Sequence, residues 1–209
     1  ASLRALEYPE DPQQWTDEDK EQLARDIRQR TKPIVLVANK ADIAPPENLE
    51  RLQASDKPVI PTTADGELAL RNAAESGIVE YLPGDEDFDV VADVSDAQRE
   101  GLETIREVMA EHGGTGVQDA VDTAVYDVLD MVTSYPVQNE TRWTDGTGEM
   151  LPDAFLLRRG STPKDLAFAV HSDIGEGYLH AVDARSKRRI AEDYELEEGD
   201  VIKIVSTAS

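Results

Sequence analysis

The feature that most constrains the fold is an unbroken apolar run at residues 34–38, which ends in Asn39-Lys40-Ala41-Asp42. Such a run predicts a strand buried on both faces, as in parallel sheets. The carboxyl ends of the strands form the edge of an open α/β sheet where ligands bind. The sequence therefore predicts a ligand-binding edge that carries an amide, an ammonium group and a carboxylate.

These residue types suit a purine base. The Asp42 carboxylate can accept hydrogen bonds from the ring N–H and the exocyclic amine of guanine, whereas adenine would leave it unpaired. Asn39 can hold the loop and contact the purine N7, and the stem of Lys40 can cover the ring face. Asn-Lys-x-Asp resembles the guanine-specificity motif of the GTPases. The resemblance implies that this edge binds GTP or GDP.

A second apolar segment at residues 59–64 ends in Thr63-Ala64. Its spacing predicts a second buried strand, parallel to the first and reached by a right-handed crossover. Thr63 and Ala64 would then lie beside Asn39, where the Ala64 N–H can donate to the guanine O6. GTPases have a Ser-Ala-type turn here, and Thr63 keeps the hydroxyl. The alternative is that Thr-Thr-Ala only ends a strand and caps a helix at residues 67–76.

Composition predicts a soluble globular protein. The chain has 209 residues, enough for one or two domains with cores of their own, and 39% of them are hydrophobic. No apolar run approaches the length of a membrane span, and the first residues do not resemble a signal peptide, so we expect a cytoplasmic protein without a membrane partner. There is no cysteine, which excludes disulfides and thiolate catalysis. Three scattered histidines predict no metal site: His112, His171 and His180.

The formal net charge of −23 is extreme for a folded chain, because it strains the compact state unless salt screens it. Lysine is half as common as arginine. Together these features predict adaptation to a salt-rich cytoplasm; the alternative is an acidic face for a basic partner. Residues 1–135 hold 30 acidic and 12 basic residues, whereas residues 136–209 hold 14 and 9, which indicates a domain boundary near residue 135.

Helical patterns dominate the first part of the chain. A helix is expected from Thr16, a short one at residues 47–53, and two long ones at residues 96–112 and 117–133. The glycine-rich segment 113–116 is interpreted as a helix–helix turn and not as a phosphate cradle, because no strand precedes it and no Lys-Ser/Thr follows. We therefore expect half of a nucleotide-binding domain at 1–95 and a helical connection at 96–134.

The last part, residues 135–209, changes to short strands near 135–137, 154–157, 178–182 and 201–205. Thr162-Pro163 with Asp165 predicts a helix start among them. This order suggests a β-grasp, ubiquitin-like domain. Residues 157–167, 170–175, 184–189 and 194–202 resemble the TGS domain of threonyl-tRNA synthetases, some GTPases and stringent-response enzymes.

The two halves together resemble the Obg-related, YchF-type GTPases of the archaeal branch. Segments 67–71 and 81–84 are also typical of that family. The resemblance implies a partial P-loop-GTPase-like parallel sheet with helices, followed by a β-grasp TGS domain. It further implies a translation- or ribosome-associated GTP-binding protein, of which the sequence covers only the C-terminal half.

The sequence has no G-x-x-x-x-G-K-[S/T], so we expect this chain alone not to hydrolyse GTP and predict no catalytic residue in it. Magnesium is expected only with an N-terminal half. Segment 145–148 formally matches the magnesium-switch loop, but it follows the guanine motif in a predicted hairpin turn. A fragment of a longer GTPase and a protein that lost its catalytic half both stay open.

Seven cations are concentrated in this acidic chain in two groups, and we expect them to share a face that contacts ribosomal or transfer RNA. They are Arg158, Arg159, Lys164, Arg185, Lys187, Arg188 and Arg189. The alternative is a solvated turn that pairs with acids such as Glu192 and Asp193. A rival to the guanine hypothesis is a non-enzymatic RNA- or ribosome-binding module whose nucleotide fold is only a scaffold. His171 is expected to be a satisfied polar residue at a helix end.

Overall fold

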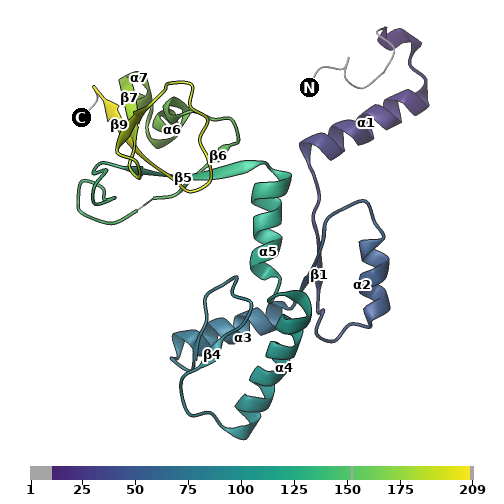
Figure 1. Ribbon diagram of the computed structural model, residues 1–209. Helices are drawn as coiled ribbons and strands as arrows, with labels where there is room; N and C mark the ends of the chain where they lie inside the picture. The colour runs from purple at the N-terminus through teal and green to yellow at the C-terminus, as the bar shows by residue number, and fades with distance from the viewer. Residues whose placement is uncertain (1–10, 152, 208–209) are drawn as a thin grey trace. The chain divides into compact units, whose positions relative to one another are not determined.

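A computed structural model describes residues 11–151 and 153–207, and contacts divide the chain into two units (Figure 1). The first unit ends at Thr123 and the second begins at Ala124. The first is mixed α/β, and the second is a five-stranded sheet with two helices.

The first unit contains a parallel strand pair, an antiparallel strand pair and the helices between and after them. Its elements are a 3-10 turn Pro12–Gln14, α1 Asp17–Thr31, β1 Leu36–Asn39, α2 Pro46–Gln53, β2 Val59–Thr62, α3 Ala64–Glu75, β3 Val79–Glu80, β4 Asp89–Val90, α4 Asp96–His112 and α5 Val117–Asp122. Strands β1 and β2 are parallel, with Asn39 opposite Thr62, and α2 forms the crossover. The parallel pair predicted from the sequence is therefore confirmed.

Local sequence signals set the helix ends in this unit. Thr16 and Asp19 form a capping box at the start of α1, and Ser95 and Gln98 form another at the start of α4. Helix α4 ends at Gly113, whose φ of +80° is the left-handed conformation that closes a helix. These residues explain why both helices begin where the sequence predicts.

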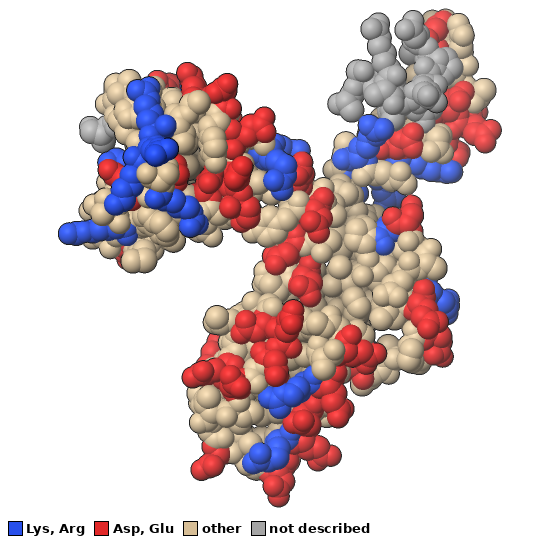
Figure 2. All heavy atoms as spheres, viewed as in Figure 1, with Lys and Arg blue, Asp and Glu red and all other residues tan. Residues whose placement is uncertain are grey.

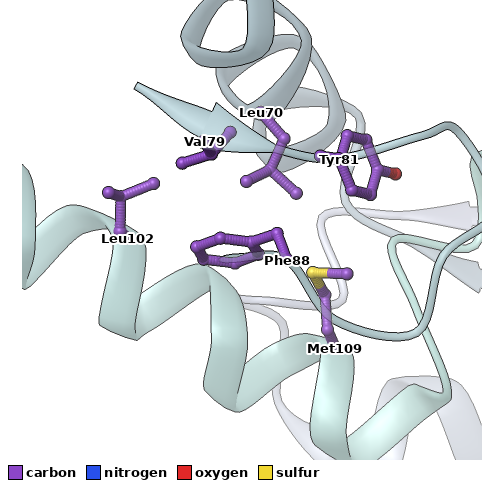
Figure 3. Packing of buried hydrophobic residues seen from close by; sticks show 6 residues of the cluster. All are labelled: Leu70, Val79, Tyr81, Phe88, Leu102 and Met109. Atoms are coloured by element: carbon purple, nitrogen blue, oxygen red, sulfur yellow. The ribbon is translucent and has the colours of Figure 1, made fainter. Parts of the chain in front are cut away.

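The core of the first unit lies away from the parallel strands. It is formed by side chains of α3, the β3–β4 segment and α4 (Figure 3): Leu70, Val79, Tyr81, Phe88, Leu102 and Met109. By contrast, none of the side chains described between residues 11 and 61 is buried, and Val37 in β1 is 51% exposed. The prediction that β1 is buried on both faces is wrong for this chain, because β2 is its only strand neighbour among the described residues.

The second unit is built on one mixed sheet. Its elements are a π-helical turn Thr123–Val128 at the junction of the units, β5 Met131–Val137, β6 Phe155–Arg158, α6 Pro163–Val170, α7 Ser172–Glu176, β7 Tyr178–Asp183, β8 Arg188–Ile190 and β9 Asp200–Ser206. The strand order is β6-β5-β9-β7-β8, with β5 and β9 parallel at the centre and the other pairs antiparallel. Helix α6 begins with the predicted Thr162–Asp165 capping box, with Pro163 in its first turn.

The core of this unit lies between the sheet and α6. Val132, Leu166, Ala181, Leu196 and Ile202 are almost completely buried. Leu166 of α6 therefore faces the core. The sheet with its covering helix confirms the β-grasp architecture.

One predicted helix is shorter than expected. The pattern at residues 117–133 predicted a continuous helix, but α5 ends at Asp122 and Asp130, with φ of +52°, turns the chain into β5. Val132 is consequently a buried strand residue, and Val121 is half exposed. The cause is tertiary: pairing of β5 with β6 and β9 outweighs the local helical periodicity.

Candidate functional site

The candidate site lies at the carboxyl ends of β1 and β2, where Asn39 ties the two strand ends together. Its side-chain Oδ1 accepts hydrogen bonds from the backbone N–H of Lys40 at 2.9 Å and of Ala64 at 3.1 Å. The Ala41 N–H also donates to the Thr62 carbonyl at 3.1 Å. The structure thus brings together the two segments that the sequence placed at one edge.

Lys40 has a left-handed backbone, with φ of +69°, which is uncommon for a residue other than glycine. The Ile43 and Ala44 N–H groups both donate to its carbonyl, at 3.2 and 3.0 Å, and so close the turn after β1. The Asp42 side chain is exposed and forms no hydrogen bond or ion pair with the described residues. Its carboxylate is available to a ligand.

Thr63 closes the second segment and starts α3. Its hydroxyl accepts from the Gly66 N–H at 3.3 Å, so it is a helix cap as well as a member of the predicted site. Its own N–H donates to the Thr115 carbonyl at 2.9 Å, and the side chains of Thr62 and Thr63 are buried. In this structure the Ala64 N–H is bound to Asn39, so a guanine O6 has to share or replace that partner.

Sequence reasoning missed a buried carboxylate directly behind this edge. Glu67 of α3 is 4% exposed and accepts three hydrogen bonds of 2.6 Å each, from Arg71 Nε, the Tyr81 hydroxyl and the Thr115 hydroxyl. Arg71 lies one turn further along the same helix, whereas Tyr81 directly follows β3 and Thr115 lies in the turn between α4 and α5. Glutamate in a helix pattern looks like a surface residue, so no single-sequence signal marked it; only its place in the family-like segment 67–71 did.

The environment of Glu67 shifts two pKa values. Burial raises the pKa of the Glu67 carboxyl, but the hydrogen bonds from Thr115, Tyr81 and Arg71 outweigh burial, so its pKa lies below the ordinary value. Burial and the bond to Glu67 raise the pKa of Tyr81 to about 12. Glu67 is therefore charged and Tyr81 neutral at physiological pH.

The glycine-rich segment 113–116 is the predicted turn between two helices, and it also supports the candidate site. A Cβ atom on Gly116 would lie 1.8 Å from the Pro61 carbonyl oxygen, and its φ is +75°. Only glycine permits this approach to the end of β2. Segment 145–148 is also the predicted turn: Asp145 Oδ1 accepts from the Thr147 and Gly148 N–H groups at 2.8 Å each.

The cations form two groups on the second unit. Figure 2 shows basic side chains gathered over the unit that holds α6 and β7, whereas acidic ones dominate the rest of that view. All seven cations are exposed. However, Arg158 lies in β6 and Arg188 in β8, which are opposite edges of the sheet, roughly 19 Å apart at the usual strand spacing. The two groups therefore do not form one continuous cluster.

Several of these cations have acidic or aromatic neighbours. Arg159 pairs with Asp130 at 2.8 Å, and Lys164 pairs with Glu192 at 3.5 Å. The Arg185 guanidinium lies 5.2 Å from the Trp143 ring centre. Pairing with Glu192 is what the alternative of a solvated turn predicted, so the arrangement supports that alternative for Lys164.

The structure offers no metal centre in its described part, since no three potential ligand side chains converge there. His171 lies between α6 and α7, where its Nδ1 accepts from the Asp173 N–H at 3.1 Å, as expected for a satisfied helix-end residue. No helix among the described residues has the length and apolar character needed to cross a membrane.

Known families match both units. Residues 37–139 match the family described as "Obg-like GTPase YGR210-like, G4 motif-containing domain", and residues 148–206 match the TGS domain. The chain is 43% identical over 204 residues to the "Uncharacterized GTP-binding protein MJ1332" of Methanocaldococcus jannaschii. That match covers 95% of this chain and 51% of the relative.

Solved structures give the same result. The structure resembles the "GTP binding protein from Pyrococcus horikoshii OT3", with a TM-score of 0.75, 42% identity, and coverage of 98% of this chain and 55% of the other. It shares its fold with the Schizosaccharomyces pombe YchF GTPase, at a TM-score of 0.50, 11% identity, and coverage of 91% and 48%. The chain spans about half the length of these relatives.

The fold and the matches define a G4-motif domain of the GTPase type joined to a TGS domain. The chain belongs to the Obg-like, YGR210-like GTPase family and carries a TGS domain, as its sequence motifs predicted.

Proposed function

We propose that the edge formed by Asn39, Lys40, Asp42, Thr63 and Ala64 binds the guanine base of GTP or GDP. The observation that carries the proposal is the joining of both motif segments by the Asn39–Ala64 hydrogen bond, together with an exposed Asp42 carboxylate that has no partner among the described residues. The carboxylate accepts from the ring N–H and exocyclic amine of guanine. Adenine has no such donor pair, so binding it would bury an unpaired charge.

Binding and hydrolysis of the whole nucleotide are proposed for a longer protein. The GTP-binding relatives are about twice the length of this chain, and this sequence holds no phosphate-binding loop. Phosphate contacts and Mg²⁺ would come from that additional part, and the base edge would supply selectivity. We also propose that the chain is divided into half of a nucleotide-binding domain at residues 1–95, a helical connection at 96–134 and a TGS domain at 135–209.

The test is a titration of the 209-residue chain in potassium chloride with guanosine and then adenosine, followed by amide chemical shifts. Nucleosides are chosen because they need no phosphate site. With guanosine only, we expect amide shifts at residues 39–42 and 63–64. Guanosine should bind at least tenfold more weakly to Asp42→Asn, because one of the two oxygens that accept from the guanine N–H groups is replaced by an amide NH2, which cannot accept. Asp93→Asn, an exposed acid away from the site, is the matched control. An equal response to both nucleosides would refute base selectivity.

A second proposed function is RNA contact through the second unit, on a ribosomal or transfer RNA. The supporting observation is the exposure of seven cations in a chain of net charge −23. Arg188 and Arg189 lie side by side on the edge strand β8, where a phosphate backbone can reach them.

The RNA proposal is tested by binding to tRNA and ribosomes across a salt series. Replacing Arg188 and Arg189 with alanine should weaken binding and reduce its salt dependence. The same change at Arg28 and Arg30, two exposed arginines of α1, is the matched control. If both pairs have the same effect, the contact is non-specific and this proposal fails.

The cellular setting is also a proposal. The excess of acidic residues supports a cytoplasm rich in salt, since screening relieves repulsion within the chain. Thermal unfolding at increasing potassium chloride tests it, and a chain of this kind should become more stable as salt rises.

A further inference from the structure

The buried carboxylate of Glu67 is not one of the base contacts, yet it is connected to them. Its Oε2 atom accepts from the hydroxyls of both Tyr81 and Thr115, and its Oε1 atom accepts from Arg71. Burying a charge is costly, and an apolar residue would pack at this position without that cost. The three short hydrogen bonds offset the cost but do not explain why the carboxylate is there.

Thr115 connects Glu67 to the base edge. Its hydroxyl donates to Glu67 at 2.6 Å, while its carbonyl accepts from the Thr63 N–H at 2.9 Å. Thr63 directly precedes Ala64, whose N–H donates to Asn39 at the proposed base edge. Glu67 and Thr63 are also joined by a backbone bond, because the Glu67 N–H donates to the Thr63 carbonyl at 3.0 Å. The Glu67 carboxylate therefore holds the loop through Thr115, next to the backbone bond that starts α3.

The turn that carries Thr115 has little freedom to shift. Gly114, Thr115 and Gly116 are buried, and Gly116 packs directly against the Pro61 carbonyl at the end of β2. A displacement of the turn therefore moves the backbone that leads into Thr62, Thr63 and Ala64. The side-chain bond from Thr115 to Glu67 fixes the turn on α3.

We infer that Glu67 is a positioning residue for guanine recognition: through Thr115 it sets where the Thr63–Ala64 peptide lies beside the base. This inference rests on the proposed guanine-binding function. Thr115 acts in the same way, and neither residue touches the nucleotide. The loss of either link lets the Ala64 N–H move away from its partner at the base edge.

The experiment compares variants of the full 209-residue chain in the guanosine titration. Glu67→Met removes both acceptor oxygens at a similar side-chain length, and Thr115→Val removes the hydroxyl but keeps the carbonyl. We expect each to raise the guanosine Kd by about tenfold, the effect of losing one hydrogen bond at the base edge. At saturation the guanosine-induced shift of the Ala64 amide should also be smaller than in the wild type, which loss of folded protein alone would not produce.

Two controls separate positioning from general stability. Arg71→Gln removes the half-exposed guanidinium that donates to Glu67 but has no bond to the Thr63–Ala64 segment. Val79→Ala weakens the core of the first unit without changing Thr115. Both should bind guanosine within about twofold of the wild type and keep the full Ala64 shift.

The outcomes are distinguishable. If the wild type selects guanosine and Glu67→Met and Thr115→Val bind it as tightly as the wild type, only the positioning role is refuted. If Val79→Ala weakens binding as much as Glu67→Met, lost stability explains both and the inference is again overturned. If the wild type responds equally to guanosine and adenosine, the proposed base selectivity fails, and this inference fails with it.

Discussion

The parallel pair β1–β2 of the first unit and the five-stranded sheet of the second unit are held together in different ways. The five-stranded sheet packs against α6 and buries residues such as Leu166 and Ile202 completely. The parallel pair buries no apolar side chain of its own among the described residues, and Val37 in β1 is 51% exposed. Both sheets contain apolar strands, so apolar sequence alone does not determine burial; the number of neighbouring layers does.

The candidate base site is built on the less packed of the two sheets. Its geometry depends on hydrogen bonds: Asn39 to Ala64, Ala41 to Thr62, and Thr63 to Thr115. Tyr81 of the core formed by α3, β3 and α4 donates to Glu67, which also accepts from Thr115, so this core is connected to the Thr63–Thr115 bond. Directional polar contacts can therefore keep a ligand-binding edge in shape where strand packing is incomplete.

The largest expected contrast is between core truncations in the two sheets. Leu166→Ala removes a fully buried side chain and should lower the free energy of unfolding of the second unit by about 2–5 kcal/mol. Val37→Ala removes a half-exposed one from β1 and should cost less than about 1 kcal/mol. Urea unfolding followed by Trp143 fluorescence and by amide exchange in the first unit measures both. Equal costs would show that β1 is packed as tightly as the second sheet.

The next contrast is between two tyrosine hydroxyls. Tyr81 donates to the charged Glu67, so Tyr81→Phe should destabilise the first unit by about 1.5–3 kcal/mol. Tyr126 is bonded to the neutral Thr133 hydroxyl at 2.9 Å, so Tyr126→Phe should cost the second unit about 0.5–1.5 kcal/mol. The denaturant midpoints of the two variants show which substitution destabilises its unit more. A larger loss of stability for Tyr126→Phe would contradict the expectation that the hydrogen bond to the charged Glu67 is the stronger one.

Acid should destabilise each unit partly by protonating a hydrogen-bonded carboxylate: Glu67 in the first unit and Asp183 in the second. Although burial raises the pKa of Glu67 and of Asp183, their hydrogen bonds lower both below the ordinary values. A lowered folded-state pKa adds stability above the unfolded-state pKa of about 4, and this stability is lost as the pH falls through the folded-state value.

One variant in each unit tests how much its carboxylate contributes to the loss of stability at low pH. Glu67→Gln should flatten the fall in stability below about pH 4 in the first unit, and Asp183→Asn should do so in the second. Thermal unfolding between pH 2 and 7, with amide exchange as the probe for each unit, provides the measurement. If both variants lose stability below pH 4 as steeply as the wild type, other carboxylates dominate the pH dependence of stability.

The smallest effect is expected for an exposed ion pair. Arg159 and Asp130 are both more than half exposed, so Arg159→Ala should change the free energy of unfolding of the second unit by less than about 1 kcal/mol. This makes it a usable variant for RNA binding, because a lost interaction would not reflect unfolding. A large drop in the unfolding midpoint would instead show that the pair holds the turn into β5.

Much of this arrangement could be predicted from the sequence, and the failures have physical causes. The parallel pair, the meeting of Asn39 with Ala64, and the capped start of α6 follow from local patterns that the structure confirms. The strand that begins at Met131 could not be predicted, because its pairing with β6 and β9 overrides the helical period of the last predicted helix. Glu67 was missed because two of its partners, Tyr81 and Thr115, come from separate segments, and a polar helix residue carries no mark of burial.

The open parallel pair also affects how molecules of this chain meet one another. In the described part of the chain, β1 and β2 each have a partner on one side only, and Val37 is exposed beside them. An uncovered strand edge is a template for pairing with another copy, and repulsion between molecules of charge −23 opposes that encounter. At roughly 0.1 M salt, repulsion between charges extends only about 10 Å. Added salt therefore relieves charge repulsion within one molecule, and it also lets the strand edges of two molecules approach each other. Solubility should therefore pass through a maximum as salt is raised.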